Sequence, residues 1–177
     1  MACMIGEAIS LIANICTIVA FIIAVHLWLT WKKQQNYSFE RDKIFEAELA
    51  VSKLHTALMN YISEHYNYKL KDIPSSTVID PPYYQHRFRE AESLIQSLSV
   101  EYELAIHALS VLEVAYSKDE IISYFMLDSY YMDLVKQINE CEETESLTQL
   151  YWKKMIPEMM SKRSKASKHL ANIRKGL

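Results

Sequence analysis

The chain has 177 residues, of which 50% are hydrophobic and 23% charged, and a net charge of −3. This composition excludes a disordered or fibrous protein. Only 2 Gly and 4 Pro are present, too few for the turns of an all-β fold or for a glycine-rich phosphate loop.

The first predicted element is a membrane-spanning helix over about residues 8–31. From Ala8 to Trp31 the chain has no Asp, Glu, Lys or Arg, and about 20 apolar residues suffice to cross a bilayer. The segment lacks the basic start and the small-residue cleavage site of a signal peptide. We therefore expect an anchor over residues 1–33 and a separate body over residues 34–177.

Residues at the end of this segment predict its orientation. Trp28 and Trp31 are suited to the headgroup layer, and Lys32 and Lys33 follow directly. Because basic residues favour the cytoplasmic side, we expect a single-pass membrane protein with its N-terminus outside and its C-terminal body in the cytoplasm.

Small or polar side chains recur along one stripe of the predicted span at spacings of three and four residues. Such a stripe permits close approach of two helices in lipid, although small residues are also common in spans generally. We predict self-association through it, which makes the protein a homo-oligomer. The stripe consists of Ser10, Ala13, Thr17, Ala20 and Ala24, with Asn14 beside it.

The rest of the chain shows helical periodicity and predicts an all-α fold with about four long helices in an antiparallel bundle. The expected helices cover about 39–70, 81–116, 117–140 and from 145 onward. Asp80-Pro81-Pro82 is typical of a helix start, and Ser117 to Glu120 has the form of a capping box. Pro157 is expected to kink or end the last helix. Asn36-Tyr37-Ser38 forms either a joint or part of one continuous helix.

The apolar faces of these helices predict the core. The positions expected to face it include Phe45, Leu49, Leu58 and Ile62 in the first body helix; Leu94, Ile95, Tyr102 and Leu109 in the second; Ile121, Phe125, Met126, Met132 and Ile138 in the third; and Leu147, Tyr151, Met155 and Met159 in the fourth.

Charge is segregated along the chain, with −10 over residues 72–160 and +6 over the tail 161–177. The tail can bind an anionic lipid surface or, less readily, nucleic acid; alternatively, it neutralises the acidic body or suits a helix C-terminus. Its basic residues are Lys162, Arg163, Lys165, Lys168, Arg174 and Lys175.

Motifs that carry chemistry are missing from the sequence. There is no H-E-x-x-H or G-x-S-x-G motif, and Cys3, Cys16 and Cys141 form no zinc-binding spacing. Glu103 and His107 do not match the Glu-x-x-His spacing of a di-iron bundle. We expect no catalytic residue, cofactor or metal. Pro81-Pro82-Tyr83-Tyr84 matches a P-P-x-Y ligand, but a helix start explains its prolines better.

Two functions without catalysis are compatible with this organisation: a membrane-acting effector held in check by a protein partner, and an anchored adaptor that recruits a cytoplasmic protein. An enzyme with an unrecognised site is a third hypothesis. The apolar span, the Trp28-x-x-Trp31-Lys32-Lys33-Gln34-Gln35 element and the helical body resemble small bacterial inner-membrane proteins.

Some of these proteins are similar to transmembrane effectors of anti-phage, retron-type defence, and this resemblance implies membrane disruption. Such effectors include proteins with two spans. A second span here would need residues 93–116, which contain Glu101, Glu103 and Glu113, so the resemblance implies action as an oligomer.

Overall fold

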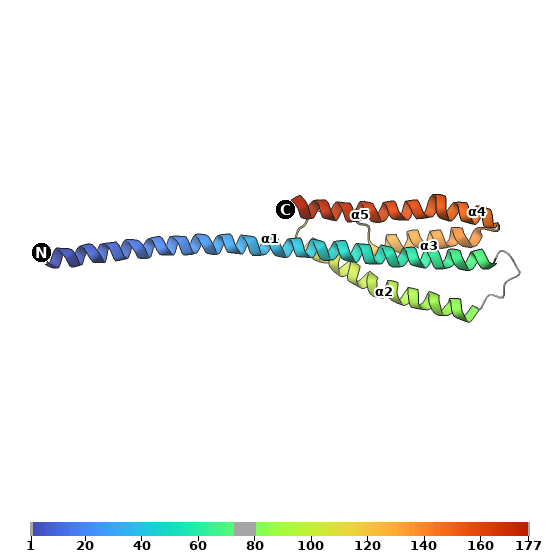
Figure 1. Ribbon diagram of the computed structural model, residues 1–177, viewed down its shortest axis with the longest axis horizontal. Helices are drawn as coiled ribbons and strands as arrows, with labels where there is room; N and C mark the ends of the chain where they lie inside the picture. The colour runs from blue at the N-terminus through green and yellow to red at the C-terminus, as the bar shows by residue number, and fades with distance from the viewer. Residues whose placement is uncertain (1, 73–80, 177) are drawn as a thin grey trace. The chain divides into compact units, whose positions relative to one another are not determined.

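The computed structural model describes the backbone of residues 2–72 and 81–176, and side chains over residues 14–71 and 83–176. Every described regular element is helical, as the periodicity predicted. The helices are α1 (Ala2–Asp72), α2 (Pro81–Val111), α3 (Tyr124–Glu140), α4 (Thr144–Gln149), a π-helix η1 (Leu150–Met155) and α5 (Ile156–Gly176). Because α4, η1 and α5 follow one another without a gap, they form one interrupted helix and bring the total to four (Figure 1).

The chain divides into two compact units, Met1–Glu40 and Arg41–Leu177. Residues 36–38 lie within α1, so this segment continues the helix and does not form a joint. In the second unit, one face of α1 is buried, and its residues recur at intervals of three or four. They are Ile44, Ala47, Val51, Leu54, Leu58 and Ile62.

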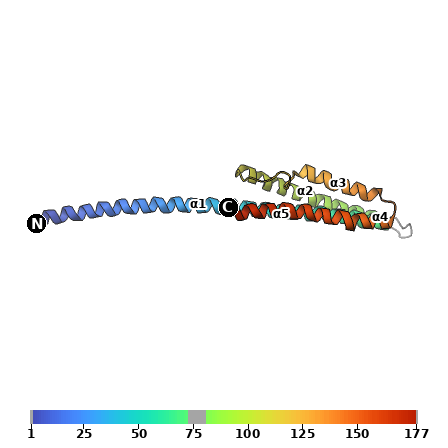
Figure 2. The same ribbon diagram turned by 90° about the horizontal axis from the view of Figure 1, so that it is seen from above.

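One apolar core joins all the long helices of the second unit. Its fully buried members include Leu58 of α1, Leu109 of α2, Leu127 of α3 and Leu170 of α5. Burying a side chain of this size contributes about 1.5–3 kcal/mol, so this cluster is the main source of stability for the second unit. Figures 1 and 2 show its helices lying along one another.

The end of α2 differs from the prediction because the chain forms a Schellman-type cap. The N–H of Val114 donates to the carbonyl of Leu109 at 3.0 Å and that of Glu113 to Ser110 at 3.1 Å. Glu113 has φ of 57°, a left-handed conformation usually taken by glycine. The helix therefore ends at Val111 rather than near Tyr116.

The start of α3 was also predicted wrongly. Ser117 accepts backbone hydrogen bonds from Glu120 and Ile121, which make a single turn. The helix begins at Tyr124, and the hydroxyl of Ser123 accepts a hydrogen bond from the N–H of Met126 at its N-terminus. Pro81 is the first residue of α2, as predicted; the expected cap Asp80 lies outside the described residues.

The buried face of α3 matches the predicted one only in part: Ile121, just before the helix, and Ile138 are buried as predicted. Leu127, Tyr131, Leu134 and Ile138 are buried, whereas Phe125 is 80% exposed. On the buried side of α3, the Tyr131 hydroxyl lies 3.3 Å from Nδ1 of the core residue His55. Met126 and Met132 of α3, Leu94 of α2, and Phe45 and Leu49 of α1 are likewise exposed rather than in the core.

The last helix passes through Pro157 without ending, because a π turn precedes the proline. The N–H of Ile156 donates to the carbonyl of Tyr151, five residues back. Leu147, Tyr151, Met155 and Met159 are all buried at four-residue spacing, which exceeds the 3.6 residues of an α turn. The wider π turn keeps all four on one side and makes room for a residue that lacks an N–H.

Candidate functional site

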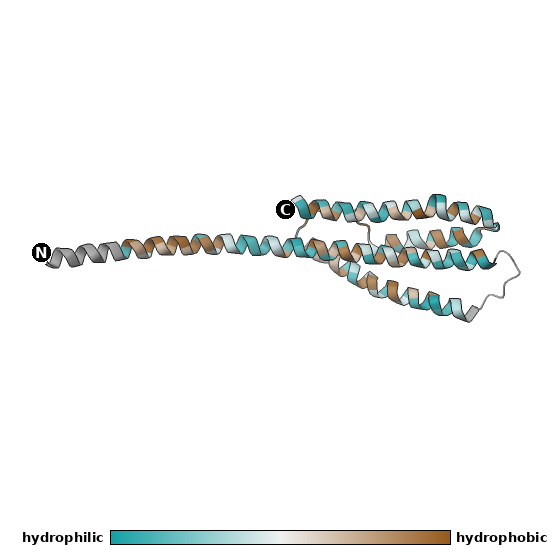
Figure 3. Cartoon of the chain, viewed as in Figure 1, coloured by the Kyte–Doolittle hydropathy of each residue, from teal (hydrophilic) through white to brown (hydrophobic). Residues whose placement is uncertain are grey.

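The apolar part of α1 presents a fully exposed hydrophobic surface. Residues 14–31 are all exposed and contain no Asp, Glu, Lys or Arg, and Phe21 is 69% exposed. By length and composition this helix can cross a membrane, since 18 residues rise about 27 Å. Figure 3 shows the run as the brown stretch of α1. A soluble monomer rarely exposes so large an apolar surface.

The predicted interface residues lie at the end of this run. Trp28 and Trp31 are 55% and 58% exposed, so their rings are free to enter a headgroup layer. The ammonium group of Lys32 lies 5.5 Å from the centre of the Trp28 ring, a cation–π distance. Lys33 is exposed next to it.

The predicted self-association stripe is described only in part. Asn14, Thr17, Ala20 and Ala24 are exposed on α1. Ser10 and Ala13 lie in the helical backbone of α1, but their side chains are outside the described residues. The stripe stays a prediction.

The six basic residues of the tail fall into two groups. Three face the body. The guanidinium of Arg163 donates to the Ser52 hydroxyl at 2.7 Å. That of Arg174 donates to both carboxylate oxygens of Glu48 at 2.7 and 3.2 Å, and Lys162 lies 4.4 Å from the centre of the Tyr130 ring.

The other three, Lys165, Lys168 and Lys175, are exposed. They make no ion pair within the described part of the chain. The inward group ties α5 to α1 and α3, and binding of an anionic surface by the outward group stays a prediction.

A buried polar pair that sequence reasoning missed lies in the core. His55 is 4% exposed, and its Nδ1 lies 3.3 Å from the Tyr131 hydroxyl. Burial, together with the nearby charges of Arg163 and Lys162, lowers the pKa of His55 to about 4. The imidazole is thus neutral at pH 7 and can accept the tyrosine hydrogen bond. No sequence motif marks His55, so only a structure could reveal the pair.

Aromatic residues hold α1 against the last helix and α2. The rings of Tyr66 and Tyr151 stack with centres 3.9 Å apart, and the hydroxyls of Tyr151 and Ser63 are 2.6 Å apart. Tyr84 of the P-P-x-Y sequence is 7% exposed and accepts a hydrogen bond from Lys71 at 2.6 Å. The buried tyrosine excludes the peptide-ligand interpretation and supports the helix-start one.

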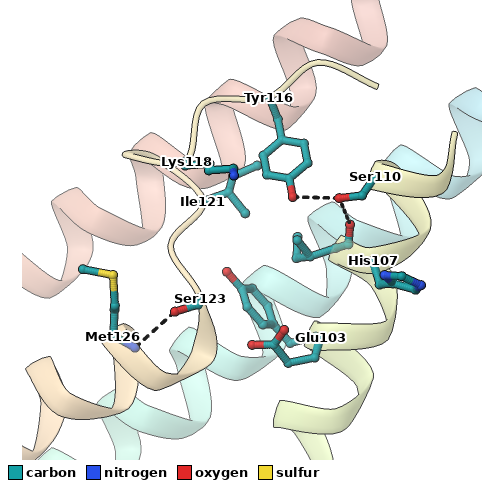
Figure 4. Close-up of a pocket in the computed structure, with 10 residues that line it drawn as sticks. Glu103, His107, Ser110, Tyr116, Lys118, Ile121, Ser123 and Met126 are labelled. Atoms are coloured by element: carbon teal, nitrogen blue, oxygen red, sulfur yellow. Dashed lines mark hydrogen bonds between the residues drawn. The ribbon is translucent and has the colours of Figure 1, made fainter. Parts of the chain in front are cut away.

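The pair Glu103 and His107 lines a pocket of about 440 Å³ between α2 and the loop that precedes α3 (Figure 4). The carboxylate of Glu103 accepts the N–H of Tyr124 at 2.8 Å, which places this charge at the start of α3. On another side, the Tyr116 hydroxyl lies 3.1 Å from Ser110. The contacts of Glu103 and Tyr116 therefore connect α2 to the loop and to α3.

Among the described residues, no group of three or more His, Cys, Asp or Glu side chains could hold a metal ion. Cys16 is an exposed free thiol, and Cys141 is a half-buried one. Comparison with protein-family models, with curated proteins and with solved structures finds no match for this chain. Its function must therefore be inferred from its own residues.

Proposed function

We propose that this chain is a membrane-anchored helical protein that acts without catalysing a reaction. We further propose that it is a membrane-acting effector of a bacterial anti-phage defence system, held in check by a protein partner. The observation that carries the proposal is the uncharged, fully exposed helical run of residues 14–31. Lipid is the solvent in which such a surface is stable.

Lys32 and Lys33 support an orientation with the N-terminus outside and the body in the cytoplasm. In this proposal the body is an antiparallel four-helix bundle. The hydrogen bond between Lys71, near the end of α1, and Tyr84, near the start of α2, supports a chain reversal there. Self-association through the span would give the oligomer that a single-span effector needs to disrupt a membrane.

Anchoring is tested by expressing the untagged chain in bacteria and extracting the membranes with alkaline carbonate. The wild-type chain should remain in the pellet until detergent is added. Replacing Ile18 and Ile22 with lysine should release it, because each apolar-to-lysine change costs about 3–4 kcal/mol of insertion free energy at a span centre. The matched control changes both to leucine. Recovery of the wild-type chain in the soluble fraction would refute the anchor.

The effector role is tested separately, by inducing the chain alone and measuring membrane potential with a voltage-sensitive dye. Depolarisation is expected for the wild-type chain and not for the lysine variant, which must accumulate to a similar level. Normal potential and growth with the chain inserted in the membrane would refute membrane disruption and leave the anchor intact.

The second candidate, an anchored adaptor, is favoured by exposed apolar residues on α2. Val100, Leu104 and Val111 are 57%, 64% and 67% exposed and recur at spacings of four and seven residues, which places them on one helix face. If the chain is an adaptor, in-cell crosslinking should give one stoichiometric partner, and serine at these three positions should abolish the crosslink without releasing the chain from the membrane.

A further inference from the structure

A line of exposed residues runs along the outside of the last helix and is dominated by lysines, with one exposed acidic residue, Glu158, beside it. Its members, which we call the lysine stripe, are separated by three or four residues and are all exposed; they are Lys154, Pro157, Ser161, Lys165, Lys168, Asn172 and Lys175. Residues at this spacing share one helix face. The stripe extends about 32 Å at 1.5 Å per residue.

The inward contacts of α5 fix which way the stripe faces. Arg163 and Arg174 bind Ser52 and Glu48 of α1, and Met159, Ala166 and Leu170 are buried in the core. The opposite side of the helix is therefore turned away from the body. Figures 1 and 2 both show α5 along the outside of its unit.

The four lysines of the stripe act as one cationic surface. Lys165, Lys168 and Lys175 make no ion pair among the described residues, and the ammonium of Lys154 contacts a neutral acceptor, Gln137, at 3.3 Å. Their charge is thus not neutralised within the described body. Four aligned cations can contact one extended anionic surface together, which the six basic residues of the tail cannot do, since three of those face inward.

We propose that the lysine stripe binds the anionic headgroup surface of the membrane that anchors the chain, an inference that rests on the proposed anchoring. Lys33 and Arg41 are separated by seven residues, so the body begins within about 30 Å of the bilayer in any arrangement. Tethering makes the encounter intramolecular, which favours lipid over a freely diffusing polyanion.

The test measures lysine acetylation by mass spectrometry on the full chain in nanodiscs. Discs of phosphatidylcholine are compared with discs that contain about 30% phosphatidylglycerol, a source of the negative surface potential that attracts basic segments. The lysines of the stripe should react more slowly in the anionic discs, and Lys53 and Lys136, exposed elsewhere on the body, should react equally in both. At about 1 M NaCl the difference should vanish, because the screening length falls to about 3 Å.

Two double variants test whether the lysines of the stripe, rather than exposed lysines in general, bind the anionic lipid. Changing Lys165 and Lys168 to glutamine should lower the ratio of docked to free body about 30-fold, since each lysine near an anionic surface contributes about five-fold. The matched control, glutamine at Lys53 and Lys136, removes the same charge and should leave the protection of the stripe unchanged.

Three outcomes would overturn the proposal. Equal acetylation of the stripe in both discs would exclude lipid binding while the anchor stands, whereas failure of the chain to enter any disc would refute the anchor itself. Stronger protection by single-stranded RNA in phosphatidylcholine discs than by anionic lipid would assign the stripe to nucleic acid instead.

Discussion

The buried imidazole of His55 should make the free energy of unfolding depend on pH. In the folded chain its pKa is about 4, because the ring is buried and lies near Arg163 and Lys162. An unfolded histidine has a pKa of about 6.5. As the pH falls below that value, the unfolded chain takes up a proton that the folded chain does not, so the folded state loses stability.

The size of the effect follows from the shift. A shift from 6.5 to about 4 corresponds to about 3 kcal/mol at about 1.4 kcal/mol per pKa unit. The stability supplied by neutral His55 is complete above about pH 6.5 and is lost progressively as the pH falls to about 4. Burial also lowers the pKa of His65, so the wild-type chain should lose more than the contribution of His55 alone.

The measurement is urea unfolding of the full chain in non-ionic detergent, followed by circular dichroism from pH 7 to pH 4. Comparing the wild-type chain with His55→Gln cancels the contributions of His65 and the carboxylates. The difference between their free energies of unfolding should shrink by about 3 kcal/mol from pH 7 to pH 4. His107→Gln, at an exposed position, should follow the wild-type curve. If the free energies of unfolding of the wild-type chain and His55→Gln differ by the same amount at every pH, the lowered pKa of His55 is refuted.

The face and cap of α3 lead to two further predictions, each with an internal control. Leu127→Ala should lower the free energy of unfolding by about 2–5 kcal/mol, because the side chain is fully buried. Phe125→Ala should change it by less than about 0.5 kcal/mol. A larger loss for Phe125→Ala than for Leu127→Ala in urea unfolding would show that the predicted face is the one in the core. Ser123→Ala should cost about 1 kcal/mol through loss of the N-cap, whereas Ser117→Ala should be nearly neutral, and equal losses would indicate a helix start at Ser117.

Periodicity was enough to predict the helical class, the long apolar segment and the face of the last helix. Leu147, Tyr151, Met155 and Met159 are buried as expected because large apolar residues recur there without a competing face. In α3 apolar residues occur nearly all round the helix, so spacing alone could not identify the buried side. The buried side packs against residues far away in the sequence, such as His55, 76 residues from Tyr131, and no local pattern contains that information.

The end of α2 and the start of α3 were predicted less well than the other helix ends. The cap after α2 places Glu113 at a position that glycine normally fills, so the usual signal was missing. Of the predicted surface residues, the outward lysines of the tail could be recognised by charge. Lys154 could not, because it precedes the tail and joins the lysine stripe only through the geometry of the interrupted helix.

The π turn before Pro157 also limits which insertions and deletions this chain can accept. Removing one residue from Leu150–Met155 would let an ordinary α-helix form without rotating the rest of the helix, because a π turn accommodates one extra residue. Removing one residue between Met159 and Leu170 would instead rotate everything after it by about 100°, so that Leu170 would turn toward water and Arg174 would lose Glu48. Homologous chains should therefore tolerate a one-residue deletion in the π turn and conserve the number of residues between Met159 and Leu170.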